Sequence, residues 1–189
     1  MRLLLASASP RRRELLAAAG LVFDIAAPDV DERCLAGEPA ATYVERLARL
    51  KATTAGAGEP ERPVLGADTA VVVDGEVLGK PVSAEDAAGM LRRLSGRSHD
   101  VLTGIAVAWR GEIWSEVVRT RVWMARLSAA QIEAYVATGE PMDKAGGYAI
   151  QGRAARFISH IEGSLTNVVG LPVASVLQLL RRAGAPGVE

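Results

Sequence analysis

The chain has 189 residues, 49% of them hydrophobic, which suits one packed domain or two lobes that share a core. Its 22 basic and 22 acidic side chains give a formal net charge of zero, which argues against a dedicated nucleic-acid or membrane-surface binder, because such proteins carry a basic excess. The single cysteine, Cys34, excludes an internal disulfide framework and zinc sites built from several cysteines.

Strand-like and helix-like segments alternate along the chain, which predicts an α/β fold. The first strand, Leu3 to Ala6, leads into a helix that has Ser9 at its N-cap and Pro10 at its first position and that ends near Gly20. The pattern then predicts a strand at 22–26, an acidic loop at 28–37, a helix at 39–55 with Tyr43, Leu47 and Leu50 on its apolar face, a linker at 56–63, a strand pair within 64–73 that breaks at 66–69, a tight turn at 74–75 and a strand at 77–78.

The second half of the chain begins with a helix at 83–94 that has Ser83 as its N-cap. Its clearest feature is a hairpin of two long strands, at 101–109 and 113–124. After it the pattern predicts a helix at 128–137 with a capping box of Ser128 and Gln131, a glycine-rich stretch at 139–152, a strand at 155–161, a closing helix at 171–182 and a frayed tail after about residue 184.

The loop after the first strand, from Ser7 to Ser9, opens a helix rich in arginine. The free N–H groups and the dipole of a helix start attract anions, and Arg11 and Arg12 add donors suited to phosphate. Arg13 lies in the same turns, but helical residues are roughly 100° apart, so the three arginines cannot all face one ligand. Two interpretations stay open: a polyphosphate cradle, or a capped helix with solvated arginines.

A carboxylate and two lysines are further candidates. Asp68 is expected at the end of an apolar strand, where it can hold a divalent metal, act as a general base toward water, or close a local Asx-turn. Lys80, between a glycine and a proline, either points at a phosphate or is a solvated turn lysine. Lys51 is expected beside the apolar face of its helix, where it either snorkels or reaches into a cleft.

Two acid-bearing loops contain the pairs Asp31–Glu32 and Asp143–Lys144. Hydrolysis of a phosphoanhydride with Mg²⁺ needs several carboxylates and several cations, although surface charge pairing also explains each pair. Gln151, in the glycine-rich stretch, offers the donor and acceptor that a pyrimidine edge requires. The two histidines, His99 and His160, lack the spacing of a metal pair and are expected to have structural roles.

Taken in order, a series of short motifs resembles the Maf family of nucleotide pyrophosphatases from about Leu4 to Pro172. The motifs are 7–12, 31–32, 46–48 with 51–52, 66–69, 79–81, 94–96, 103–104, 143–146, 150–152 and 169–172. The resemblance implies a single domain over residues 1–189, with a mixed twisted sheet, flanking helices and two lobes around a cleft, similar to the inosine triphosphate pyrophosphatases. It also implies hydrolysis of a nucleoside triphosphate to the monophosphate and pyrophosphate, with Mg²⁺ or Mn²⁺ as cofactor.

The resemblance also implies roles for particular residues. In this family the aspartate of the Gly-Ala-Asp-Thr motif is taken as the proton acceptor, which is Asp68 here. Because the resemblance brings these motifs to one cleft, our hypothesis is that Asp68 and Glu32 hold the metal, with the division of roles between them and Asp143 left open. In the same hypothesis the triphosphate is bound by the loop after the first strand and by nearby cations, namely Ser7, Ser9, Arg12, Lys51 and Lys80.

Three positions indicate the substrate. Arg11, Thr69 and Gln151 match the dTTP/UTP group of the family, whereas the 7-methyl-GTP group carries Trp, Gln and Glu at these positions. A cationic purine favours an aromatic stack and a carboxylate, so pyrimidine triphosphates are the expected substrates. The alternatives are the same chemistry on CTP or 7-methyl-GTP, or a nucleotide-binding regulator of septum formation without turnover.

Localisation and assembly follow from weaker signals. The sequence has no run long enough to span a bilayer, and its first apolar stretch is too short for a signal peptide. We therefore expect a cytoplasmic protein with no nucleic-acid or membrane partner. The resemblance suggests a homodimer, and it is compatible with either nucleotide house-cleaning or arrest of cell division.

Overall fold

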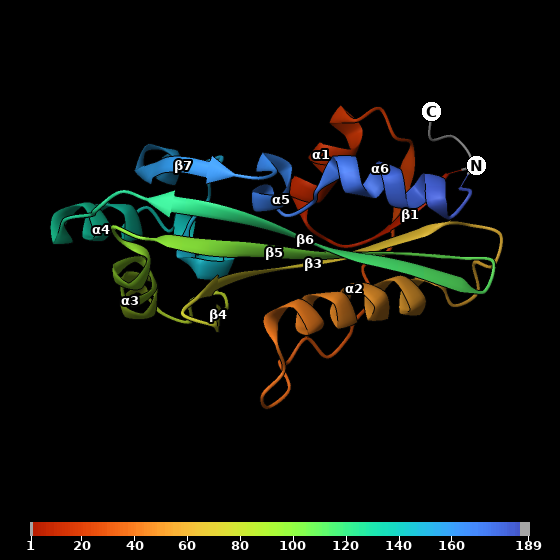
Figure 1. Cartoon of the computed structure of the whole chain (residues 1–189), viewed down its shortest axis with the longest axis horizontal. Helices are drawn as coiled ribbons and strands as arrows, with labels where there is room; N and C mark the ends of the chain where they lie inside the picture. Colours follow the sequence, from red (N-terminus) through yellow and green to blue (C-terminus); the bar gives the residue numbers. More distant parts are fainter. Residues whose placement is uncertain (1, 186–189) are drawn as a thin grey trace. The chain divides into compact units, whose positions relative to one another are not determined.

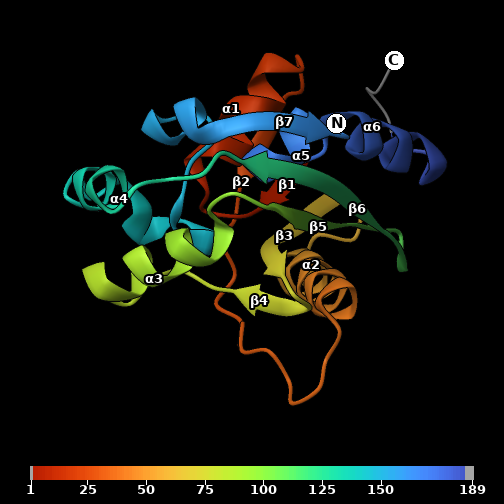
Figure 2. The same cartoon turned by 60° about the vertical axis from the view of Figure 1, so that its left-hand side comes forward.

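The computed structural model describes residues 2–185, and Figures 1 and 2 show it from two sides. The α/β prediction is confirmed, because within these residues seven strands form one mixed sheet with flanking helices. The sheet has the order β2-β1-β3-β5-β6-β7, and β4 pairs with β3 off this path. The strands are β1 (Leu3–Ala6), β2 (Phe23–Ile25), β3 (Val64–Val73), β4 (Glu76–Leu78), β5 (Ser98–Trp109), β6 (Glu112–Met124) and β7 (Ile158–Glu162).

Among the described residues, four of the α-helices lie between strands along the chain, and the last two follow β7. The helices are α1 (Pro10–Ala18), α2 (Ala40–Gly56), α3 (Ala84–Leu94), α4 (Ala129–Val136), α5 (Leu165–Val169) and α6 (Val173–Arg182), with short 3₁₀ helices at Glu140–Asp143, Ala145–Gly147 and Arg153–Phe157. None of the helices within 2–185 combines the length and the apolar character that crossing a bilayer requires.

The chain divides by its internal contacts into two compact units. The first consists of Met1–Thr69, Thr103–Val118 and Gly170–Glu189, and the second of Ala70–Leu102 and Arg119–Val169. The single domain and the cleft between two lobes therefore stay predictions. The tail expected to fray lies outside the described residues from residue 186 onward.

In the first unit, β1 pairs in parallel with both β2 and β3. Helices α1 and α6 cover one face of this part of the sheet, and α2 covers the other (Figure 1). The core under α1 and α6 is built from fully buried aliphatic side chains, among them Leu5, Leu16, Ile105 and Leu179. On the other face, small residues of α2 and β5 let the helix approach the sheet closely: Ala48, Ala52 and Ala106.

The second unit has a separate core that includes the aromatic pair Tyr135 and Phe157, whose ring centroids are 5.6 Å apart. Its helix starts agree with the sequence predictions. The Ser83 side chain accepts a hydrogen bond from the N–H of Asp86 at the start of α3. The capping box at Ser128 is complete, because both of its hydrogen bonds are present.

Some sequence predictions about local structure were wrong. The segment 64–73 is one unbroken strand, because Gly66 still pairs with Ala6 of β1 and the strand runs on to pair with β4 at residues 71–73. The strand expected at 155–161 begins only at Ile158, after a 3₁₀ helix, and the short helix α5 was not predicted at all. Ser9 takes the N-cap position of α1, but its side chain makes no capping hydrogen bond.

The buried face of α2 also differs from the prediction. Leu47 is fully buried as expected, but Tyr43 and Leu50 are only half-buried. The buried stripe runs instead through Val44, Leu47, Ala48, Lys51 and Ala52. The prediction followed the large apolar side chains and did not consider the alanines. The small alanine side chains nevertheless decide which side of the helix can lie against the sheet.

Buried His99 is expected to make the free energy of unfolding depend on pH. Its Nε2 atom lies 2.7 Å from the hydroxyl of Tyr148, and burial lowers the pKa of His99 from 6.5 to about 4. The unfolded chain binds a proton between these two values and the folded chain does not, so stability falls as the pH drops from 6.5 toward 4. The contribution of His99 to this loss is at most about 3 kcal/mol, which urea unfolding can measure. Between pH 6.5 and 4 the free energy of unfolding should therefore fall less in His99→Gln than in the wild type. Equal losses in both proteins would contradict the assignment to His99.

Candidate functional site

The candidate site of the first unit lies where β1 ends. The last residue of β1, Ala6, pairs with Gly66, and the chain then leaves the sheet through Ser7 to Ser9 into α1. Because β3 continues past Gly66, Asp68 lies just beyond the carboxyl end of β1, where ligands commonly bind in α/β sheets. The expectation that Asp68 ends its own strand was therefore wrong, since the strand that ends there is its neighbour.

Side chains alternate along β3, so Gly66 and Asp68 share the face that α2 covers. A Cβ atom at Gly66 would lie 2.1 Å from the backbone oxygen of Ala48 and 2.7 Å from the backbone nitrogen of Ala52. The missing side chain thus allows the backbone of α2 to touch the strand. This close approach brings Lys51, which precedes Ala52, down to the level of Asp68.

Lys51 joins two carboxylates in a largely buried cluster. Its Nζ atom lies 2.6 Å from Oδ1 of Asp68 and 2.6 Å from Oε1 of Glu32. Lys51 is 7% exposed and Asp68 is 8% exposed, whereas the Glu32 side chain is 56% exposed. The lysine therefore does not snorkel to the surface, and the acidic loop 28–37 and β3 each present one carboxylate to it.

The donor atoms of this cluster determine whether it can hold a divalent metal ion. Among residues 2–185, no three His, Cys, Asp or Glu side chains are grouped so that they can hold a metal ion. Glu32 and Asp68 supply only two carboxylates, and both contact Lys51. This donor set fits Mg²⁺, which commonly binds through one or two carboxylates and completes its shell with water and substrate phosphates. The protein cannot provide the whole shell by itself.

Arg12 lies on the side of β3 opposite to Lys51, and its guanidinium donates hydrogen bonds to oxygen atoms of the protein. Its Nε atom donates to the backbone oxygen of Gly170 at 2.9 Å, and Nη1 donates to the oxygen of Ala67 at 2.8 Å and to Oγ of Ser7 at 3.1 Å. Its Nη2 atom donates to Oγ1 of Thr69 at 3.2 Å. Since a guanidinium has five N–H donors, most of them are already engaged. Arg12 ties α1, β3 and the start of the last segment together.

The buried guanidinium is also an electrostatic component of the site. Burial lowers the pKa of Arg12, while the negative charges of Asp68 and Glu32 act in the opposite direction and Arg11 acts with burial. Arginine keeps its charge at any ordinary pH, so Arg12 is a fixed cation close to both carboxylates. Its neighbour Arg11 is half-buried, and within the described residues no hydrogen bond or ion pair is found for it.

The remaining predicted residues of the first unit lie around Arg12. The hydroxyl of Ser7 accepts from the N–H of Ser9 at 3.2 Å, which fixes the loop after β1. The hydroxyl of Thr69 lies 3.0 Å from that of Thr103 and 3.3 Å from the oxygen of Gly170. Sequence reasoning gave Thr103 and Gly170 no role, although both belong to the short motifs that carried the resemblance.

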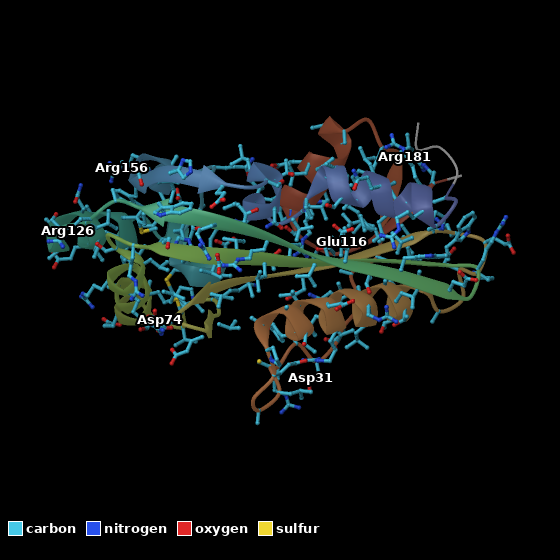
Figure 3. All side chains as sticks on the ribbon, viewed as in Figure 1. Asp31, Asp74, Glu116, Arg126, Arg156 and Arg181 are labelled. Atoms are coloured by element: carbon cyan, nitrogen blue, oxygen red, sulfur yellow. The ribbon has the colours of Figure 1, made fainter. Side chains whose placement is uncertain are left out.

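The loop that carries Glu32 is fastened to α2, which the sequence did not suggest. The hydroxyl of Tyr43 donates to the backbone oxygen of Glu32 at 3.0 Å, and Arg46 donates to the backbone oxygen of Arg33 at 3.1 Å. Asp31, which Figure 3 labels on this loop, forms an exposed ion pair with Arg33 and is not part of the cluster. The only available signal was the arginine of the 46–48 motif.

Lys80 and Gln151 belong to the second unit, and both are exposed there. Their two loops are connected, because the N–H of Gly146 donates to the backbone oxygen of Gly79 at 3.0 Å. Asp143 forms an ion pair with the adjacent Lys144. These contacts order the two loops within the second unit. Phosphate binding by Lys80 and recognition of the base by Gln151 remain predictions.

Glu140 fixes the glycine-rich stretch of the second unit through its carboxylate. Its carboxylate accepts from the hydroxyl of Tyr135 at 2.8 Å and from the N–H of Arg153 at 3.1 Å. A Cβ atom at Gly152 would lie 2.3 Å from the same carboxylate, so the glycine makes room for it. These contacts hold the turn on which Gln151 lies.

Comparisons with known proteins agree with the motifs. The sequence profile of the family described as "Maf-like protein" matches residues 2–183. A curated dTTP/UTP pyrophosphatase of Anaeromyxobacter dehalogenans (strain 2CP-C) is 56% identical over 98% of this chain and 95% of the relative. One of Myxococcus xanthus (strain DK1622) is 53% identical over 97% of this chain and 93% of the relative. The solved Ham1 protein of Staphylococcus aureus has a TM-score of 0.54 at 15% identity, covering 97% of this chain and 100% of that chain, which shows a shared fold alone.

Proposed function

The chain belongs to the Maf family, and from this membership we propose that it hydrolyses dTTP and UTP to the monophosphate and pyrophosphate. The curated relatives at more than half identity over nearly the whole chain are named dTTP/UTP pyrophosphatases, which supports the proposal. The observation that carries it is the cluster of buried Lys51 and Asp68 with the more exposed Glu32 beyond the end of β1. It combines a carboxylate suited to activating water with a cation suited to phosphate.

In the proposed reaction Asp68 accepts a proton from the water that attacks the α-phosphorus, and the bond from this phosphorus to the bridging oxygen of pyrophosphate breaks. Lys51 exchanges its ion pairs with Asp68 and Glu32 for contacts with the phosphate oxygens of the substrate. Arg12 contributes fixed positive charge from the other side of β3. A divalent cation held by Glu32, Asp68 and phosphate oxygens would offset the charge that develops on the departing pyrophosphate. The backbone and hydroxyls of Ser7 and Ser9 are expected to bind phosphate oxygens.

Selection of the base is proposed for Arg11, Thr69 and Gln151, because they match the dTTP/UTP group at the positions where the family's groups differ. The Thr69 hydroxyl already contacts Arg12, Thr103 and Gly170. We therefore expect Thr69 to act on specificity mainly through the position of its neighbours. Lys80 is proposed as a further phosphate ligand, and a homodimer in the cytoplasm is the expected state of the protein.

The proposal is tested by product analysis with purified protein, Mg²⁺ or Mn²⁺, and dTTP, UTP, CTP, GTP and 7-methyl-GTP in parallel. We expect pyrophosphate and monophosphate from dTTP and UTP. Turnover of CTP or 7-methyl-GTP instead would keep the chemistry and overturn the assignment of Arg11, Thr69 and Gln151. Binding of nucleotide without turnover would contradict the proposed hydrolysis and favour the alternative, a nucleotide-binding regulator of septum formation.

A further inference from the structure

We propose that Tyr43 and Arg46 are positioning residues that hold the acidic loop 28–37 on α2, so that Glu32 stays opposite Asp68 during the reaction. The inference rests on the proposed function, because it assigns no new chemistry but explains how Glu32 is kept in place. The loop has no helix or strand of its own, and Glu32 is exposed within it. Its position must therefore come from contacts with a rigid neighbour.

Two hydrogen bonds from α2 reach consecutive backbone oxygens of the loop. Tyr43 Oη donates to the oxygen of Glu32 at 3.0 Å, and Arg46 Nη2 donates to the oxygen of Arg33 at 3.1 Å. Residues three apart on a helix are neighbours on its surface, so the tyrosine and the arginine form one contact patch. The first of these oxygens belongs to Glu32 itself, so fixing it and the next carbonyl restrains the backbone from which the Glu32 side chain leaves.

Arg46 is itself held by Glu38 at the far end of the loop. Its Nε and Nη2 atoms lie 2.6 and 2.7 Å from the two carboxylate oxygens of Glu38, whose side chain is only 6% exposed. The same carboxylate accepts from the N–H of Leu35 at 3.1 Å. This bidentate pair gives Arg46 a fixed geometry that a lysine could not reproduce. The loop is thus attached to α2 in its middle, at residues 32–33, and just after its C-terminal end, at Glu38.

The need for this anchoring comes from charge. In the free protein Lys51 lies between Glu32 and Asp68 and attracts both. When a triphosphate competes for Lys51, the two carboxylates lose the lysine between them and repel each other until a divalent cation takes its place. Glu32, on an irregular and exposed loop, would then move away more easily than Asp68 in the middle of β3. Tyr43 and Arg46 oppose this movement through neutral backbone contacts that the phosphate does not disturb.

The test measures the metal requirement of variants that keep both carboxylates. Tyr43→Phe removes one hydroxyl and Arg46→Met removes the guanidinium. We expect the Mn²⁺ concentration for half-maximal dTTP hydrolysis to rise about fivefold in the first and about tenfold in the second. Mn²⁺ binding, followed by EPR with a pyrimidine α,β-imido triphosphate that is not cleaved, should weaken by similar factors. Arg93→Met, which breaks the exposed ion pair with Glu76 in the second unit, should leave both quantities unchanged.

A double-mutant cycle separates positioning from general loss of structure. In a Glu32→Gln background, Tyr43→Phe and Arg46→Met should no longer change the Mn²⁺ response, because the group that they position is already gone. Variants that melt at lower temperature but keep the wild-type Mn²⁺ response would overturn the positioning role. A Glu32→Gln protein with an unchanged Mn²⁺ response would instead overturn the part of the proposed function that assigns Glu32 to the metal.

Discussion

Replacing Asp68 by asparagine is expected to lower kcat for dTTP by about 10²–10⁴-fold, the usual contribution of a general base. An amide cannot accept the proton of the attacking water, and it adds no negative charge for a cation. Lys51 keeps Glu32 as its partner, and the amide oxygen of the variant can still accept from its Nζ atom. The fold should therefore survive, because no buried charge is left alone.

The measurement is steady-state kinetics with dTTP, together with thermal unfolding followed by circular dichroism. The matched control is Asp74→Asn, which removes an exposed carboxylate that pairs with Arg97 in the second unit. Asp74 has a φ of 53°, a conformation that asparagine tolerates well, so the control should keep both activity and stability. An Asp68→Asn protein with near-normal kcat would show that another group activates the water.

Replacing Gly104 by alanine is expected to destabilise the first unit by about 3 kcal/mol or more, the upper part of the range for overpacked cores. A Cβ atom there would lie 2.2 Å from the backbone oxygen of Val44 and 2.7 Å from the backbone nitrogen of Glu45. Backbone atoms of α2 cannot rotate away as the end of a side chain can. The helix would have to move off the sheet as a whole, and Lys51 would move with it.

Urea unfolding followed by circular dichroism tests this expectation, with Gly89→Ala as the control. Gly89 lies inside α3 with no atom within 4 Å of the position of an added Cβ, so alanine there should stabilise by up to about 1 kcal/mol through helix propensity. Opposite signs for the same chemical change would identify close packing as the cause. Wild-type stability of Gly104→Ala would mean that α2 does not pack on β5 as described.

Local signals predicted much of the secondary structure. Ser83 and Ser128 were correctly identified as helix starts, because a capping side chain acts on backbone groups within three residues. The hairpin of β5 and β6 was also predicted, though β5 begins earlier, at Ser98. The prediction was wrong at Gly66, where glycine was taken as a break in the strand. Gly66 instead allows the backbone of α2 to contact the strand, and the residues next to Gly66 in the sequence do not indicate such a contact.

The sequence by itself determined the family, the α/β class and the identity of the candidate residues, because ordered motifs and hydrophobic periods are properties of the chain alone. Only the tertiary structure decided their arrangement. It buried Lys51 between Glu32 and Asp68, and it engaged most donors of Arg12 with protein oxygens. It also fastened the acidic loop through Tyr43 and Arg46. The physical reason is distance along the chain: these contacts join segments that meet only once α1 and α2 pack on opposite faces of β3.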